Sequence, residues 1–404
     1  MTTGPRLDDL AILSGRPAFG EALHVGRPNI GDREALLRRI NDILDRRWLT
    51  NDGPCVREFE ARVAAVAGVR HAVAVCNATA GLEIAIKALD MKGEVIVPSF
   101  TFIASAHALT WCGITPVFCD IDPATHNLDP ARAAALVTER TTGILGVHVW
   151  GRPCATEALT ELARRRNLHL LFDAAHAFGA GHAGRAIGGF GEAEVFSFHA
   201  TKFVNAGEGG AVVTDNDDLA ARLRLLRNFG IAGLDTGVHL GINAKMAEVA
   251  AAMGLSSIDG MEGFIAVNHG NWRGYREALR DIDGIALAPY SEKERCNYQY
   301  VVLEIDERRT GIDRDTLVEV LRAENVLARR YFYPGCHRME PYRTLYPDAE
   351  AALPHTEALA RRVIVLPTGA DVGPHEIGAI ASILRVAVTQ APELKARLRS
   401  APRR

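Results

Sequence analysis

The sequence contains little lysine. Of 404 residues, 46 are lysine or arginine. Only six are lysine: Lys87, Lys92, Lys202, Lys245, Lys293 and Lys395. The net charge of -3 at pH 7 offers no basic surplus, so we expect no nucleic-acid binding. Arginine stays charged and cannot act as an amine nucleophile, so any reaction that needs a neutral amine must use one of these lysines.

Patterns for a metal site and for a disulfide framework are also absent. The seven cysteines are an odd number and none lies in a C-x-x-C pair. Reduced thiols are typical of the cytoplasm, where we expect the protein to reside. The histidines have no spacing typical of metal ligands, so we expect no metal; the group considered is His148, His169, His176, His182 and His199.

Long apolar runs, internal repeats and low-complexity segments are missing as well. No run of about 18 apolar residues is present, so we expect no membrane-spanning helix. The chain starts without a basic segment followed by an apolar run, and we expect no secretory signal. A hydrophobic content of 48% with 24% charged residues is ordinary for a soluble globular enzyme.

Apolar strand-like runs alternate with helix-like runs from residue 71 onward, which predicts an α/β fold with a mostly parallel sheet. The predicted strands are 71–76, 94–98, 115–120, 143–149, 169–173, 194–198 and 211–214, the last two as an antiparallel hairpin. The predicted helices are 82–89, 104–110, 130–138, 156–166 and 217–228.

The C-terminal third predicts a smaller α+β domain. Residues 244–281 are helical with a break near Gly260. The remaining predicted elements are a strand at 297–305, a helix at 314–324, a strand at 326–332, and two further segments at 356–363 and 375–387. The arginine-rich tail, residues 391–404, is predicted to fray.

Two polar residues close consecutive apolar strands. Asp173 ends the run 168–172, and Lys202 follows the run 193–196 within a few residues. The carboxyl ends of parallel strands are where α/β sheets bind ligands. A lysine that forms an imine and an acid that holds a ring nitrogen protonated are the pair that pyridoxal phosphate requires. Taken singly, Lys202 could close a strand at the surface and Asp173 could cap a helix; together they favour the cofactor.

A phosphate cradle is predicted where the strand 71–76 turns into the helix 82–89. Small residues at such a turn leave backbone N–H groups free at a helix start, where the dipole favours an anion. Thr79 adds a hydroxyl, and Ser197 could reach the same phosphate. An ordinary strand-to-helix turn is the alternative interpretation.

These motifs resemble the DegT/StrS family of nucleotide-sugar aminotransferases. The resemblance rests on SFHATK (197–202), FDAAHAFGA (172–180), CNATAGLEIA (76–85) and VPSFTFIASAHA (97–108). It implies the type I fold of pyridoxal-phosphate enzymes, with a seven-stranded, mostly parallel sheet between helices in a large domain. That domain, with an N-terminal arm, would span residues 1–265, and a smaller α+β domain would span residues 266–404.

The resemblance also implies roles for single residues. Lys202, Asp173 and His176 are the implied catalytic residues: Lys202 forms the Schiff base, Asp173 pairs with the ring nitrogen, and His176 lies beside the ring. Phe102 stacks on the cofactor. The implied cofactor-binding set is Ala78, Thr79, Phe102, Asp173, His176, Ser197, Lys202 and Asn243.

Asn243 matches an asparagine that reaches the cofactor phosphate of the neighbouring subunit. The resemblance therefore implies a homodimer with active sites shared across the interface.

Three further segments are similar to 4-aminotransferases that act on dTDP-4-keto-6-deoxyglucose in actinobacterial antibiotic pathways, such as the one leading to desosamine. The segments are VGRPN (25–29), GINAKM (241–246) and YFYPGCH (331–337). We expect glutamate as amino donor and a dTDP-keto-sugar as acceptor. The expected substrate contacts are Trp48, Asn51, Lys245, Arg330, Tyr331, Tyr333 and His337.

Other functions stay open at this point. Amination of a 3-keto-sugar or a keto-cyclitol would use the same residues. A sugar 3-dehydrase of this family would carry histidine in place of Lys202, which disfavours dehydration. A non-catalytic regulator that binds the cofactor or an aminosugar is the alternative of a different class.

Overall fold

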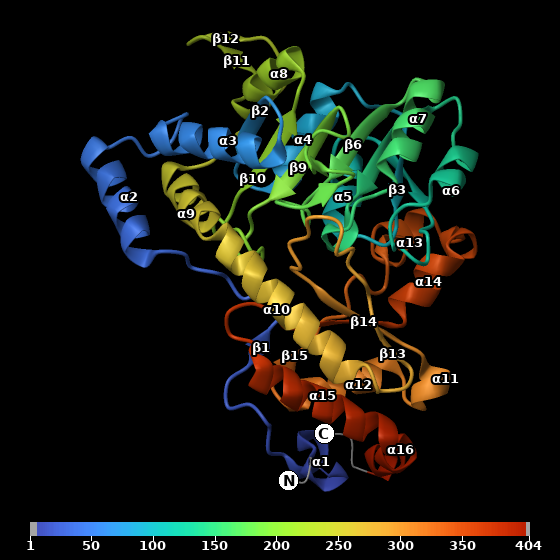
Figure 1. Ribbon diagram of the computed structural model, residues 1–404. Helices are drawn as coiled ribbons and strands as arrows, with labels where there is room; N and C mark the ends of the chain where they lie inside the picture. The colour runs from blue at the N-terminus through green and yellow to red at the C-terminus, as the bar shows by residue number, and fades with distance from the viewer. Residues whose placement is uncertain (1–5, 401–404) are drawn as a thin grey trace.

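A seven-stranded sheet forms the centre of the larger part of the molecule in the computed structural model, which describes residues 6–400 (Figure 1). The strand order is β2-β10-β9-β6-β5-β3-β4. Only β10 runs antiparallel to its neighbours, so the predicted mostly parallel sheet and the predicted hairpin are confirmed. The strands are β2 (His71–Val75), β3 (Glu94–Pro98), β4 (Thr115–Cys119), β5 (Thr141–Val147), β6 (His169–Asp173), β9 (Ala193–Ser197) and β10 (Gly210–Thr214).

Helices cover both faces of this sheet because its strands are apolar on both sides. In β10, Val212 packs in the cluster that contains α4, whereas Ala211 and Val213 pack in the cluster that contains α3. The helices that flank the sheet are α3 (Pro54–Ala67), α4 (Ala78–Ala88), α5 (Ile103–Trp111), α6 (Pro130–Ala135), α7 (Thr156–Arg166) and α8 (Asp217–Arg227).

Two consecutive helices lead from the large sheet to the C-terminal part, with the predicted break at Gly260 (Figure 1). They are α9 (Glu248–Asp259) and α10 (Met261–Leu279). Beyond them lies a three-stranded antiparallel sheet, in the order β13-β14-β16. Its strands and main helices are β13 (Ile285–Leu287), β14 (Val301–Ile305), β16 (Val363–Leu366), α12 (Arg314–Ala323), α14 (Pro354–Ala360) and α15 (Pro374–Thr389).

The N-terminal arm packs on the C-terminal part of the molecule (Figure 1). Strand β1 (Leu23–His24) pairs in parallel with β15 (Val326–Leu327), and Leu10 is buried in the same core as α15. The predicted division groups this arm with residues up to 265, a position that falls inside α10. The two-domain division stays a prediction.

The remaining elements are short or lie at the periphery. The helices are α1 (Ala11–Ser14), α2 (Arg33–Arg46), α11 (Glu307–Thr310), α13 (Tyr342–Leu345) and α16 (Ala391–Ser400). The 3-10 turns are η1 (Leu7–Asp9), η2 (Val149–Gly151), η3 (Cys336–Arg338) and η4 (Ala349–Ala352). Two small hairpins pair β7 (Gly181–His182) with β8 (Arg185–Ala186) and β11 (Ile231–Ala232) with β12 (Thr236–Gly237).

Two local predictions are wrong. The tail predicted to fray is helical from residue 391 to 400, because Ala391 and Leu394 pack into the C-terminal core; residues 401–404 lie outside the described residues. The strand predicted for 326–332 ends at Leu327, because the Ala328 N–H donates to the carbonyl of Val326 and interrupts the pairing; beyond it only Arg329 pairs, as an isolated bridge with Val365.

Among the described residues no single helix has the length and apolar character to cross a membrane. Helices α15 and α16 pass that test only when taken together, and they meet at an angle of 83°.

Candidate active site

A cavity of about 720 Å³ lies at the edge of the sheet where β2, β5, β6 and β9 end. These four strands run in the same direction, so the residues that follow them gather at one edge. Eight residues predicted from the sequence line the cavity: Ala78, Thr79, Phe102, Asp173, His176, Ser197, Lys202 and Tyr331.

Lys202 enters the cavity from the turn after β9, where its N–H donates to the carbonyl of His199 at 2.8 Å. The side chain is half-buried, and its Nζ donates to the Tyr300 hydroxyl at 3.4 Å. Burial of the amine lowers the pKa of Lys202 to about 8, against the opposing effects of Asp173 and Tyr331. A substantial fraction of this amine is therefore neutral near physiological pH.

Asp173 closes β6 and is 6% exposed. The Ser105 hydroxyl donates to Oδ2 at 2.7 Å, and the Ala175 N–H donates to Oδ1 at 3.0 Å. Burial raises the pKa of Asp173, while these two donors and the charge of Lys202 lower it. These two donors fix the orientation of the carboxyl group. A carboxyl group that pairs with a ring nitrogen needs such a fixed orientation.

His176 is buried beside Lys202 and Tyr300. The Trp150 N–H donates to its Nδ1 at 3.2 Å, which fixes the ring with Nδ1 as an acceptor. Burial first, and the charge of Lys202 second, hold the pKa of His176 well below its ordinary value. The imidazole is therefore neutral at physiological pH.

The amino end of α4 provides an anion site in the wall of the cavity. The Asn77 side chain accepts from the Ala80 N–H at 2.9 Å, while among the described residues the N–H groups of Ala78 and Thr79 have no acceptor. A Cβ at Gly210 would lie 2.7 Å from the Ala78 nitrogen, so glycine is needed for β10 to approach this turn. Free amides at a helix start fit a phosphate.

The residues present fit pyridoxal phosphate. Phe102 is 57% exposed and lines the cavity, an unusual place for a large apolar ring unless a flat ligand covers it. The same cavity contains the partly neutral amine of Lys202, the buried carboxyl group of Asp173 and the free amide groups at the start of α4. Among residues 6–400 no three His, Cys, Asp or Glu side chains gather where they could hold a metal ion.

Several predicted residues lie outside this cavity. Trp48 and Asn51 are exposed in the loop before α3. Asn243 is exposed, and Lys245 donates to the Asn228 side chain at 2.9 Å. These four residues do not meet Lys202 within one chain.

Three further predicted residues also lie outside the main cavity. Two of them line a second cavity that adjoins it, and the third is buried in the protein. Arg330 and Tyr333 lie in the adjoining cavity, close to Tyr331. His337 is buried, with its ring nitrogens 2.7 Å from the Ser99 hydroxyl and 2.8 Å from Glu357 Oε1. That placement favours a structural role for His337.

The lining residues that were not predicted from the sequence include four with ionisable side chains: Glu83, Glu208, Tyr300 and Arg329. Glu83 lies within the segment CNATAGLEIA, and Glu208 follows the segment SFHATK by six residues. Arg329 directly precedes the predicted residue Arg330. Closeness to a motif could therefore have indicated these three residues. Tyr300 had no such signal, because it reaches Lys202 from the start of β14.

The fold and the cavity define a pyridoxal-phosphate enzyme, and comparison with known proteins identifies its family. The model of the DegT/DnrJ/EryC1/StrS aminotransferase family matches residues 31–385. The chain belongs to this family. It is an aminotransferase, and pyridoxal phosphate is its cofactor.

Similar proteins cover nearly the whole chain. A dTDP-4-amino-4,6-dideoxy-D-glucose transaminase from Shigella dysenteriae is 34% identical over 364 residues, 90% of this chain and 98% of that protein. A GDP-perosamine synthase from Caulobacter vibrioides is 35% identical over 353 residues, 85% of this chain and 93% of that protein. The crystal structure of DesI in the presence of its TDP-sugar product has a TM-score of 0.94 at 55% identity, covering 98% of this chain and 100% of that chain.

The pKa of Lys202 predicts how the rate of cofactor capture depends on pH. Only the neutral amine attacks an aldehyde, so the rate constant for imine formation by the cofactor-free protein should rise about tenfold per pH unit and level off above about pH 8. Stopped-flow absorbance with added pyridoxal phosphate measures it. At pH 7.5 about a quarter of the amines are neutral, against about one in a thousand for an ordinary lysine.

Lys87→Ala removes an exposed lysine and should leave this profile unchanged, whereas Lys202→Ala should form no imine. A rate that keeps rising tenfold per unit up to pH 10 would contradict the lowered pKa.

Proposed function

We propose that the protein transfers the amino group of L-glutamate to the 4-keto carbon of dTDP-4-keto-6-deoxyglucose, giving dTDP-4-amino-4,6-dideoxyglucose. Two findings support this acceptor. The DesI structure, 55% identical to this chain, was determined with a TDP-sugar product, and the relative from Shigella dysenteriae is named for the same amino sugar.

The observation that carries the proposal is the meeting of Lys202 and Asp173 in one cavity. Bound pyridoxal phosphate supplies an electron sink that stabilises the carbanion formed when a substrate carbon loses its proton. Lys202, as a neutral amine, takes that proton from the α-carbon of the donor and returns it as a general acid. Asp173, oriented by Ser105, keeps the ring nitrogen protonated so that the sink stays strong.

Three other groups hold the reactants in place. The amide groups of Ala78 and Thr79, with the Ser197 hydroxyl, bind the phosphate. Phe102 covers one side of the cofactor ring. His176, neutral and bonded to the backbone of Trp150, fills the space beside the ring without adding charge.

The acceptor sugar would bind on the side of the main cavity that the C-terminal part of the chain lines, with Tyr300 and Tyr331. Tyr331 lines both the main cavity and the adjoining one, next to Arg330 and Tyr333. We assign these three residues to substrate binding. Trp48, Asn51 and Lys245 lie on loops outside both cavities, and their contribution depends on assembly with a second subunit.

The proposed reaction is tested by incubating the enzyme with L-glutamate, pyridoxal phosphate and dTDP-4-keto-6-deoxyglucose. NMR should find the new C–N bond at C4, and Lys202→Ala should lower the rate at least about a thousandfold. A 3-keto-sugar nucleotide and a keto-cyclitol serve as competing acceptors. Faster amination of either would overturn the 4-keto assignment, and failure to convert glutamate at all would favour a regulator.

The cellular role is part of the same proposal. A 4-amino-4,6-dideoxy sugar nucleotide is a precursor for glycosylation, and we assign the protein to deoxysugar biosynthesis for an antibiotic. We place it in the cytoplasm, which is supported by the seven cysteines, all of which are free.

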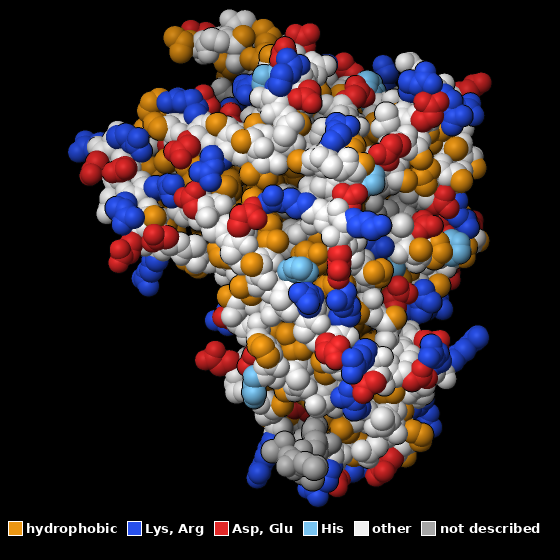
Figure 2. Space-filling view, viewed as in Figure 1, with side chains coloured by type: hydrophobic (Ala, Val, Ile, Leu, Met, Phe, Trp, Pro, Cys, Tyr) orange, Lys and Arg blue, Asp and Glu red, His pale blue; other side chains and the backbone are white. Residues whose placement is uncertain are grey.

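We propose further that the protein acts as a homodimer. The hairpin β11–β12 projects from the large sheet (Figure 1), and hydrophobic side chains gather on it (Figure 2). Leu234 and Leu240 are each 92% exposed. Asn243 follows directly on this segment. A second copy packed against the hairpin would cover the leucines and bring Asn243 towards the partner's phosphate site.

Mixing two inactive variants tests the shared site. In a heterodimer of Lys202→Ala with Asn243→Ala, one of the two sites would keep both native residues. Random exchange of subunits should therefore restore about a quarter of the wild-type activity. Activity no higher than the sum of the separate variants would contradict a site shared through Asn243.

A further inference from the structure

A second cavity of about 290 Å³ opens beside the main one and contains a concentration of arginine. Its arginines are Arg322, Arg329 and Arg330, and we refer to this cavity as the arginine annex. The two cavities share part of their walls, namely Thr101, Phe102, Arg329, Tyr331 and Phe332. A ligand that reacts at Lys202 can therefore extend into the annex past Phe102 and Tyr331.

The charges of the annex are largely uncompensated. Arg330 is paired with Asp315 at 2.8 Å. Arg329 has no acidic partner among the described residues, and Arg322 donates only to the carbonyl of Ala328, at 3.3 Å. Two cations without counter-ions in one concave site attract an anion.

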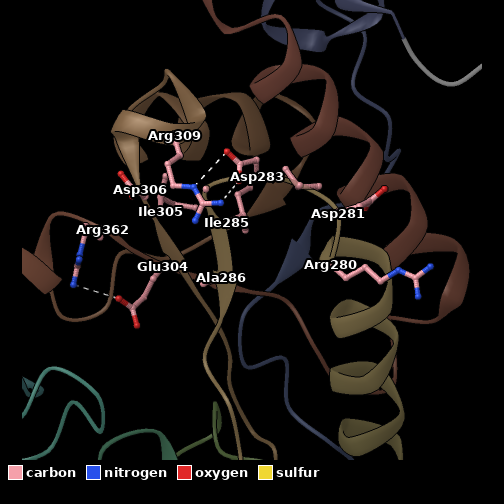
Figure 3. Close-up of a pocket in the computed structure, with 12 residues that line it drawn as sticks. Arg280, Asp281, Asp283, Ile285, Ala286, Glu304, Ile305, Asp306, Arg309 and Arg362 are labelled. Atoms are coloured by element: carbon pink, nitrogen blue, oxygen red, sulfur yellow. Dashed lines mark hydrogen bonds and ion pairs between the residues drawn. The ribbon is translucent and has the colours of Figure 1, made fainter.

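A charged cavity elsewhere in the C-terminal part provides the contrast. The cavity of about 540 Å³ shown in Figure 3 also contains arginines, but Arg309 is bonded to Asp283, and Arg362 lies 3.3 Å from Glu304. Its ion pairs are internal, and Arg280 points away from them. That cavity has no surplus of positive charge for an anionic ligand, whereas the annex has one.

The backbone of Arg329 is fixed at the junction of the two cavities, and its side chain is exposed. Its N–H donates to the carbonyl of Val365 at 3.0 Å, and its carbonyl accepts from the Val365 N–H at 2.8 Å. Its guanidinium lies over the ring of Tyr331, 5.0 Å from the ring centre. The backbone bonds fix where the side chain starts, and the contact with Tyr331 favours one placement of the guanidinium, which leaves its N–H groups accessible to a ligand.

We propose that the arginine annex binds the side-chain carboxylate of a dicarboxylic amino donor, with Arg329 as the principal contact. The cofactor phosphate is assigned to Ala78, Thr79 and Ser197, none of which lines the annex. The donor's α-carboxylate lies one bond from the reacting carbon and stays in the main cavity with Lys202. Its side-chain carboxylate extends farther, and the planar guanidinium matches it with two parallel hydrogen bonds.

The inference rests on the proposed transamination and is tested first in the donor half-reaction, which requires no sugar nucleotide; the KM for the sugar nucleotide is then measured in the full reaction. The holoenzyme is mixed with L-glutamate or L-alanine, and the conversion of its absorbance band is followed at increasing donor concentration. Arg329→Gln should raise the half-saturating concentration of L-glutamate roughly ten- to a hundredfold. L-alanine has no side-chain carboxylate, and its value should change less than about threefold.

Two matched variants complete the experiment. Arg273→Gln removes an exposed arginine of α10 outside both cavities and should leave both donors unaffected. Arg329→Lys keeps the charge but loses the bidentate geometry and should recover part of the preference for glutamate. The absorbance of bound cofactor verifies that each variant is folded.

Two outcomes would overturn the inference. An equal loss of affinity for L-glutamate and L-alanine would assign Arg329 to the α-carboxylate. An unchanged glutamate response with a raised KM for the sugar nucleotide would assign the annex to the diphosphate. If the holoenzyme converts glutamate but aminates none of the sugar nucleotides, the proposed acceptor is wrong. The donor half-reaction then still tests whether Arg329 binds the side-chain carboxylate of glutamate.

Discussion

The proposed chemistry of this protein depends on one half-buried amine, that of Lys202, beside the buried carboxyl group of Asp173. A lysine in solution is protonated at neutral pH and cannot attack an aldehyde. Burial of Lys202 lowers its pKa to about 8, and Asp173 limits the fall by favouring the charged form. Part of the amine is therefore neutral at physiological pH, which the proposed imine formation and proton transfer both require. If the cavity opened to solvent, the pKa of Lys202 would rise towards that of an ordinary lysine, and the neutral fraction of the amine would fall.

The sheet provides this environment through the direction of its strands. Because β2, β6 and β9 end at one edge, the phosphate turn, Asp173 and Lys202 meet there although they are far apart in the sequence. The C-terminal part closes the other side with Tyr300 and Tyr331, which lie close to the amine. The cavity thus combines fixed donors and acceptors from the sheet edge with aromatic and basic groups from the smaller sheet and its loops.

The sequence predicted what depends on local pattern. The apolar runs before Asp173 and Lys202 predicted two strands, and the small residues near Thr79 predicted a strand-to-helix turn; the structure contains all three and places these residues in one cavity. Their roles towards the cofactor stay predictions. It could not predict contacts that arise only when distant elements pack, such as the Ser105 hydroxyl on Asp173 or the approach of Tyr300 to Lys202.

Its errors have the same origin. The segment 326–332 has the composition of a strand, but only Val326 and Leu327 form one. The arginine-rich tail is helical because Leu394 packs into the C-terminal core. His337, assigned to the sugar pocket by its motif, is bonded to Ser99 and Glu357.

The most direct test of the central claim is to reduce the holoenzyme with borohydride and locate the modified residue by peptide mass spectrometry. We predict pyridoxyl phosphate on Lys202 alone. Label on Lys245 or another lysine, with Lys202 unmodified, would contradict the account.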